Sequence, residues 1–333
     1  MTNIVLPECW LYAARGFLSA GMDSVRVAIL PTRDDFIFTH TMVATPSLED
    51  ENQAQYFRPI FSTRGYSVSH LSMKSNSSRT FLSIATDFYA IKVVDFVLGT
   101  TVHNFVYYGR NIKYNNYTDD MHNIICEDPV SCTEIDFCGD SLRLIGGTFS
   151  GTVLLWDSAQ CSPLPSETLI NDSHTYGMKS MIIGLKANDC CVTVASRKNV
   201  LLCDRRSKYS VVRSIADNSD FSTNGEHISC FDCSMDNNCQ GKYAIGGDCG
   251  EILIKDGRKA GVSQSLNLQN KLIKAVGPIT DVGIYGKEIV ASTMYRGGFR
   301  TSLDMNTVEN FFYDPFYCTS SIFSKSGFIC IDG

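Results

Sequence analysis

The chain has 333 residues, of which 44% are hydrophobic and 19% are charged, and its formal net charge is −6. This composition indicates a folded globular protein and excludes a disordered chain, which combines low hydrophobicity with high net charge. The negative net charge disfavours nucleic acid as a direct partner, because binding to a phosphate backbone needs clustered Lys and Arg.

No run of residues approaches the ~18 uninterrupted apolar residues of a membrane-spanning helix. The first residues lack the charged and apolar regions of a signal peptide. We therefore expect a soluble intracellular protein, in the nucleus, at the nuclear envelope or in the cytoplasm, that is neither secreted nor inserted into a membrane.

In chain order, a first unit of short apolar stretches lies in residues 9–42. Residues 44–64 interrupt the pattern with prolines and acidic residues, so we predict a loop insertion there. A second unit runs from about 66 to 108, and an irregular stretch at 109–129 is predicted as a second insertion. Four more units follow, near 130–170, 178–216, 227–268 and 278–313.

Residues 141–157 show the plan of a unit most clearly, since they form two apolar runs joined by a glycine-bearing turn. Residues 242–256 repeat this plan, and the pairs Gly146–Gly147 and Gly246–Gly247 are interpreted as occupying the same position. Two β-rich runs joined by a short turn predict a β-hairpin. One further apolar stretch before each hairpin and one after it give four antiparallel strands, the anatomy of a propeller blade.

Five units end their third apolar run in an aspartate, at intervals of 62, 47, 52 and 48 residues: Asp95, Asp157, Asp204, Asp256 and Asp304. One of them follows a tryptophan, Trp156. A period of roughly 40–50 residues is the sequence sign of a repeat architecture. We interpret these aspartates as features of turns and strand ends, not as active-site acids.

After the sixth unit only two apolar runs remain, 318–323 and 327–331. The N-terminal residues 3–6 can supply one more strand, since a propeller closes by pairing its last blade with the opposite terminus. We therefore predict a short seventh blade. It either lacks a strand or presents an open edge that a strand from a partner completes.

The terminal aspartates, the single Trp156–Asp157 and a partial Gly-His at 225–227 resemble the WD40-repeat family. This resemblance implies an all-β, seven-bladed β-propeller with six clear blades and an incomplete seventh. The whole chain, 1–333, is then a single domain. Because the diagnostic motif of the family is complete in none of the units, the chain resembles a divergent member, and we expect the side-chain network that stiffens typical blades to be mostly absent.

The 14 cysteines favour core packing, because free cysteine behaves as a small buried apolar residue. The one metal-like pattern is Cys230-x-x-Cys233, followed by Cys239 and Cys249. Zinc sites do use such pairs. Positions three apart in a strand point to opposite faces, however, so we predict no metal and no cofactor.

The chain contains no nucleophile elbow, no phosphate-binding loop and no zinc-protease helix motif. We therefore predict a non-catalytic scaffold for protein–protein interaction, and the least favoured alternative is a propeller enzyme with a site in the central channel. Interaction residues are predicted at hairpin turns and exits, including Arg205, Arg206 and Arg258, because arginine is enriched at interface hot spots.

Residues 165–282, with Asp-Gly-Arg-Lys at 256–259, are similar to the small propeller nucleoporin family (nucleoporin forty-three type) of the Y-shaped nuclear pore scaffold. This similarity implies a structural subunit at the nuclear envelope, and at kinetochores in mitosis. Asp-x-Arg at 204–206 and again at 256–258 is typical of substrate adaptors of cullin ubiquitin ligases, which is an alternative. A mitotic-checkpoint propeller and a methyltransferase or chromatin cofactor are further alternatives.

Overall fold

In the computed structural model of the chain, the described residues are 2–6, 10–14, 24–31, 36–43, 58–62, 68–76, 79–86, 90–95, 98–109, 128–139, 141–170, 180–188, 190–206, 210–223, 226–235, 241–259, 264–268, 276–285, 287–295, 297–303, 308–310, 318–323 and 327–332. Within 2–62 and 318–332 the backbone alone is described.

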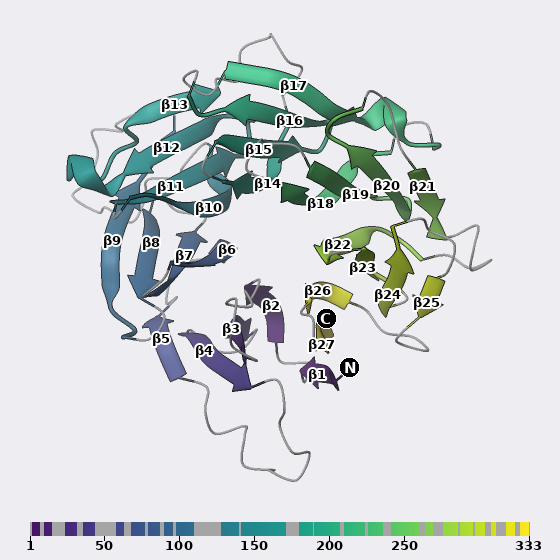
Figure 1. Cartoon of the computed structure of the whole chain (residues 1–333). Helices are drawn as coiled ribbons and strands as arrows, with labels where there is room; N and C mark the ends of the chain where they lie inside the picture. The colour runs from purple at the N-terminus through teal and green to yellow at the C-terminus, as the bar shows by residue number, and fades with distance from the viewer. Residues whose placement is uncertain are drawn as a thin grey trace, which may run out of the picture.

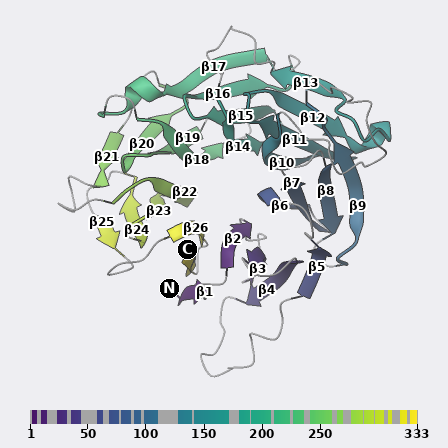
Figure 2. The same ribbon diagram turned by 180° about the vertical axis from the view of Figure 1, so that it is seen from behind.

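Seven β-sheets follow one another around a closed ring (Figure 1). Six sheets have four strands and one has three, and the view from behind shows the same ring (Figure 2). The first strand of each blade is innermost and contacts the first strands of both neighbouring blades. This arrangement confirms the predicted all-β, seven-bladed propeller.

The six four-stranded blades pair their strands antiparallel in chain order. Their strands are β2 (Trp10–Ala14), β3 (Ser24–Pro31), β4 (Phe36–Val43) and β5 (Arg58–Ser62); β6 (Val68–Ser75), β7 (Thr80–Thr86), β8 (Ala90–Asp95) and β9 (Thr101–Val106); β10 (Val130–Cys138), β11 (Ser141–Thr148), β12 (Val153–Asp157) and β13 (Glu167–Ile170); β14 (Ile182–Ala187), β15 (Cys191–Ser196), β16 (Asn199–Asp204) and β17 (Ser210–Asp217); β18 (Ile228–Met235), β19 (Gly241–Gly247), β20 (Glu251–Asp256) and β21 (Gln264–Asn267); β22 (Ile279–Tyr285), β23 (Glu288–Thr293), β24 (Gly297–Ser302) and β25 (Val308–Asn310).

The seventh blade is assembled from both ends of the chain. It contains β26 (Cys318–Phe323) as its inner strand, β27 (Gly327–Asp332) in the middle and β1 (Thr2–Leu6) outside. The pairing of β1 with β27 is parallel, with Asn3 opposite Phe328, and the two termini lie side by side in Figure 1. The predicted contribution of the N-terminal strand is therefore confirmed, and the sheet formed by the described strands is one strand shorter than the others.

The first blade differs from the sequence prediction in its fourth strand. Residues 44–64 were predicted to be an insertion, but Arg58–Ser62 is β5 and pairs with β4. Pro59 stands opposite Phe38 in this outer strand. Proline is tolerated in an edge strand because one side of that strand forms no ladder hydrogen bonds. Residues 44–57 of that insertion, and 110–127 of the second one, lie outside the described part of the chain.

The apolar side chains of the third, fourth and fifth blades pack against both neighbouring blades. Leu144 lies in a cluster with Phe105 of the second blade, whereas the next residue, Ile145, lies in a cluster with Val194 of the fourth blade. Successive residues of a strand point to opposite faces of the sheet. Strands such as β7 and β15 are therefore buried along their whole length, because both of their faces are covered.

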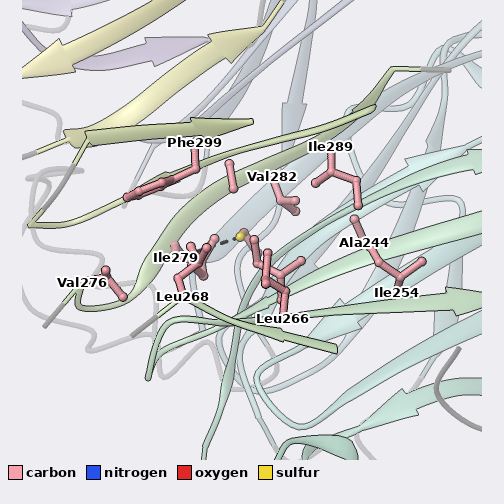
Figure 3. Close-up of a cluster of buried hydrophobic side chains, with 12 residues drawn as sticks. Ala244, Ile254, Leu266, Leu268, Val276, Ile279, Val282, Ile289 and Phe299 are labelled. Atoms are coloured by element: carbon pink, nitrogen blue, oxygen red, sulfur yellow. Dashed lines mark hydrogen bonds between the residues drawn. The ribbon is translucent and has the colours of Figure 1, made fainter. Parts of the chain in front are cut away.

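Figure 3 shows such a cluster between the fifth and sixth blades. Ile254 and Leu266 of the fifth blade meet Ile279, Val282 and Phe299 of the sixth. Each fully buried side chain of this size stabilises the fold by about 1.5–3 kcal/mol relative to its exposed state. The ring is therefore stabilised chiefly at the boundaries between blades.

Glycine in the second strands permits this close packing. A Cβ atom on Gly147 would lie 2.4 Å from Cγ2 of Ile182, and one on Gly246 would lie 2.7 Å from Cγ2 of Ile279. Because each glycine meets the first isoleucine of the next blade, Gly147 and Gly246 are the equivalent residues. The sequence suggested that the two Gly-Gly pairs occupy the same positions. In the structure they are offset by one position.

Trp156 joins the second and third blades. Its side chain is fully buried, and Nε1 donates a hydrogen bond of 3.3 Å to the carbonyl oxygen of Val106. Gly146 lies under the ring, since a Cβ there would be 2.8 Å from Cζ3 of Trp156. The tryptophan of the repeat therefore requires a glycine on the neighbouring strand.

This contact predicts non-additive effects of substitution on stability. Gly146→Ala is expected to lower the free energy of unfolding by about 1–3 kcal/mol through overpacking. Trp156→Leu is expected to cost about 2–4 kcal/mol through the cavity that it leaves. In the double variant the added methyl group fills part of that cavity. The loss in the free energy of unfolding, measured with urea, should therefore be about 1 kcal/mol smaller than the sum of the losses in the two single variants. Strict additivity would contradict the packing described.

Candidate protein-interaction surface

The repeat aspartates close the turns that follow the third strands. Oδ1 of Asp157, Asp204 and Asp256 accepts a hydrogen bond from the backbone N–H two residues later, at 3.0, 2.8 and 2.9 Å. Oδ1 of Asp95 accepts one from the N–H of Leu98, three residues later, at 2.9 Å. Such local bonds are the usual function of Asp in turns. Asp304 lies outside the described residues.

Asp157 is also held by its own blade. Burial would raise the pKa of its carboxyl group, but the N–H of Ala159, the hydroxyl of Ser141 and the guanidinium of Arg143 outweigh this effect and hold the pKa below its usual value. The Arg143 Nε lies 3.0 Å from Asp157 Oδ2. The carboxylate therefore stays charged and joins the second and third strands.

Arg205 is an anchor inside the protein. Its Nη2 lies 2.6 Å from Oδ2 of Asp136 on the third blade, and its Nη1 donates to the carbonyl oxygen of Asn188 at 2.6 Å. Only 8% of its side chain is exposed, and 4% of that of Asp136. Burial raises the pKa of Asp136, while Arg205 and Lys74 act against that rise. Arg205 therefore ties the 204–206 turn to the neighbouring blade and is not available to a partner.

Arg213 performs a similar anchoring function for the 256–259 turn. From β17 of the fourth blade it donates hydrogen bonds to the carbonyl oxygens of Gly257 and Lys259 in the fifth, the second at 2.7 Å. Local sequence gives no sign of this contact, because the acceptors of Arg213 lie 44 and 46 residues away. Both exit turns are thus anchored across a blade boundary by an arginine.

Arg206 and Arg258, here called the exit-turn pair, extend from these two anchored turns. Their side chains are 76% and 57% exposed. Nε of each lies near the Oδ1 atom of the aspartate two residues earlier, at 3.3 Å for Asp204 and 3.2 Å for Asp256. Hydrogen bonds from the side chain and backbone of Arg206 lower the pKa of Asp204. The pKa of Asp256 is also lowered, chiefly by the hydrogen bond from the backbone N–H of Arg258.

The exit-turn pair lies on one face of the propeller. Nζ of Lys186, at the end of β14, is 3.1 Å from Oδ1 of Asp232, near the end of β18, so these first strands end side by side. The third strand of a blade runs in the same direction as the first. The turns after β16 and β20 are therefore neighbours on the same face, and each presents a positioned guanidinium group.

Ion pairs also join the inner strands of other blades. Lys74 of β6 contacts Glu134 of β10 at 3.3 Å and donates to the carbonyl oxygen of Ala187 at 3.1 Å. Asp232 accepts from the N–H of Ile284 in the sixth blade at 3.0 Å. Within the described inner strands, these titratable groups are used to join blades. Their contacts are structural, since each holds two blades together.

The opposite face carries a carboxylate two residues before the first strand of two blades. In the third blade, Asp128 accepts hydrogen bonds from the N–H and the hydroxyl of Ser150, at 2.8 and 2.6 Å. In the fifth blade, Glu226 accepts one from the N–H of Cys249 at 3.1 Å. Burial raises the pKa of Glu226 to about 7, the N–H of Cys249 opposes this shift, and the charge of Glu251 adds to it.

The nine cysteines whose side chains the structure describes are free thiols. Cys230 is buried, and burial raises the pKa of Cys233 to about 12, as expected for a thiol in a packed interior. Among the cysteines of the metal-like pattern whose side chains are described, Cys249 alone belongs to a group of residues that could hold a metal ion. The other members of this group are Glu226 and Asp248. Cys239 lies outside the described residues.

No protein-family profile and no curated protein matches this chain. Solved structures do match. A chain in the crystal structure of the mitotic checkpoint complex is 13% identical with a TM-score of 0.59, and the match covers 90% of this chain and 78% of that one. The computationally designed Ika8 protein is 11% identical with a TM-score of 0.55, with coverage of 94% and 78%. At these identities the likeness shows the propeller fold.

Helices long and apolar enough to cross a membrane do not occur among the residues that the structure describes.

The lowered pKa of Asp157 predicts a pH-dependent contribution to stability. Asp157→Asn keeps an acceptor for the Ala159 N–H but loses the ion pair with Arg143. We expect a loss of about 1 kcal/mol in the free energy of unfolding at pH 7. A carboxylate with a depressed folded pKa stabilises above its unfolded pKa of about 3.9, and this contribution is lost as pH falls through the folded pKa.

The measurement is urea unfolding of the wild type and the variant from pH 7 to pH 3. The difference between them should shrink as the solution becomes acidic. Glu167→Gln, which changes an exposed carboxylate in the outer strand β13, is the matched control and should show little difference at any pH. An Asp157→Asn deficit that stays constant down to pH 3 would contradict the assignment.

Proposed function

We propose that this propeller is a non-catalytic scaffold subunit of a multiprotein complex, and that one protein partner docks on the face that carries the exit-turn pair. The observation that carries this proposal is the presence of two exposed arginines on adjacent blades, each in an Asp-x-Arg turn. An arginine contact across a blade boundary anchors each turn, through Arg205 and Asp136 in one case and through Arg213 and Lys259 in the other. Anchored turns lose little conformational entropy on binding.

The chemistry of the exit-turn pair favours an acidic segment of a partner protein. A guanidinium group offers several N–H donors in a fixed plane, which suits carboxylates. Asp204 contacts Nε and Nη2 of Arg206, and Asp256 contacts Nε of Arg258, yet both guanidinium groups stay largely exposed. Leu98, 57% exposed, and Leu164, 48% exposed, follow third strands of the second and third blades and add apolar surface at turns of the same kind.

Two identities of the complex follow from the sequence resemblances. The outer-ring Y complex of the nuclear pore is the first, and its support is the similarity over 165–282, which includes the 256–259 turn. A cullin ubiquitin ligase is the second, and the geometry of the two Asp-x-Arg turns favours it, because both arginines are exposed on adjacent blades. The incomplete seventh blade offers a second docking position, where a strand of a partner would add beside β1.

Charge reversal of the exit-turn pair tests the proposal. A tagged Arg206→Glu/Arg258→Glu chain, expressed in cells, is expected to recover its principal partner at least about tenfold less than the wild type, as loss of hot-spot arginines implies. The readout is affinity purification with quantitative mass spectrometry. Nucleoporins among the lost proteins support the Y complex, and cullin-adaptor subunits support the ligase.

The matched control is Arg197→Glu/Lys198→Glu, which reverses two exposed charges in the turn between β15 and β16, on the opposite face. It should keep the partner that the first variant loses. Equal recovery of every partner by the first variant and the wild type would overturn the proposed docking face.

A further inference from the structure

The third and fifth blades contain the same carboxylate-to-turn contact, but its chemistry differs between them. Asp128 and Glu226 each stand two residues before the first strand of their blade. Ser150 and Cys249 are the equivalent residues of the hairpin turns, since each is followed by a glycine with positive φ, Gly151 or Gly250. In both blades the backbone N–H of the turn residue donates to the carboxylate.

In the fifth blade the acid is Glu226, which is one methylene longer than Asp128. The turn residue is Cys249, which has a thiol in place of the hydroxyl group of Ser150. The longer side chain of Glu226 fits because position 247 is glycine, where a Cβ atom would lie 1.9 Å from Oε1 of Glu226. The third blade has Thr148 at this position, opposite Val130 in the ladder, just as Gly247 is opposite Ile228. Gly247 therefore makes room for the longer acid beside the turn.

This exchange leaves an unsatisfied group. Asp128 uses both carboxylate oxygens with Ser150. Glu226 is only 1% exposed, and its Oε2 has no hydrogen-bond partner among the described residues. A buried carboxylate oxygen without a partner costs free energy unless a donor or a cation compensates it.

Further ligand atoms lie beside this carboxylate. Glu226, Asp248 and Cys249 each offer one ligand atom, and these atoms lie within 4.8 Å of one another. Ligands of a tetrahedral Zn²⁺ ion, at about 2.0–2.3 Å from the metal, lie roughly 3.5 Å apart. A small closure of the exposed turn would reach that spacing. The neighbouring cation is Arg197, whose Nη2 is 4.0 Å from Oδ2 of Asp248 and whose side chain is half exposed.

We propose that Glu226, Asp248 and Cys249 form a binding site for a divalent transition-metal ion, with Zn²⁺ as the preferred ion. A thiolate with two carboxylates selects zinc over magnesium or calcium, which prefer oxygen ligands alone. Glu226 supplies the buried ligand at the base of the site, and the exposed turn supplies the other two. The fourth position is open to water or to a side chain of a bound protein. This proposal is independent of the exit-turn pair, which lies on the opposite face.

Co²⁺ is the probe, because cobalt bound to a thiolate gives a charge-transfer absorption band that water-bound cobalt lacks. Titration of the metal-free full-length chain is expected to give this band with one equivalent of Co²⁺, and added Zn²⁺ should abolish it by displacement. Cys249→Ser should remove the band. Glu226→Gln, which keeps the size of the side chain, should weaken Co²⁺ binding by at least about tenfold.

Cys161→Ser is the matched control, since it removes another exposed free thiol and should leave the titration unchanged. Circular dichroism and urea unfolding of each variant show whether it folds. Zn²⁺ should also raise the unfolding midpoint of the wild type and of Cys161→Ser but not of Cys249→Ser. The absence of a thiolate band at one equivalent, or a band that persists in Cys249→Ser, would overturn the proposal.

Discussion

Packing between blades is the interaction on which the rest of this structure depends. Where side chains are described, from the second to the sixth blade, apolar residues fill every boundary between neighbouring blades, so a blade cannot bury these side chains by itself. Ile182 fits against Gly147 of the preceding blade and Ile279 against Gly246, which shows how closely the sheets approach. Because every blade needs two neighbours, the array must close on itself. Closure in turn explains why the strand Thr2–Leu6 pairs with the strand Gly327–Asp332 from the other end of the chain.

The same constraint positions the polar groups. Once the blades are in register, charges on one blade lie beside those of the next, and Arg205 reaches Asp136 while Arg213 reaches the 257–259 turn. Buried ion pairs of this kind contribute more to specificity of arrangement than to net stability. Here they hold two surface turns, so the exposed Arg206 and Arg258 are presented by a rigid scaffold. The two candidate surfaces, the exit-turn pair and the Glu226–Asp248–Cys249 group, lie on opposite faces and can act independently.

Much of the fold could be predicted from local pattern, because strands, turns and the repeat of aspartates are encoded within about 50 residues. The hairpin at 141–157 and the function of Asp157 in a turn are examples. Features that depend on distant residues could not be predicted. Arg205 resembled a surface residue until Asp136, on another blade, was placed beside it. The strand that contains Pro59 was predicted to be a loop, because proline is a loop signal in the sequence. The offset between the two Gly-Gly pairs is apparent only from the strand register. Cys249 was first grouped with Cys230 and Cys233, whereas its neighbours in space are carboxylates.

The central claim is that seven blades form one closed ring whose last blade contains both ends of the chain. The most direct test of ring closure is amide hydrogen exchange of β27, compared with that of β15 and β19, because β27 lies between β26 and β1 and is hydrogen-bonded to both. The account predicts that β27 amides are protected nearly as strongly as those of β15 and β19. It also predicts that deleting residues 2–6 selectively abolishes protection of the β27 amides that face β1. Fast exchange of β27 in the intact chain, beside full protection of β15 and β19, would contradict ring closure by the terminal strands.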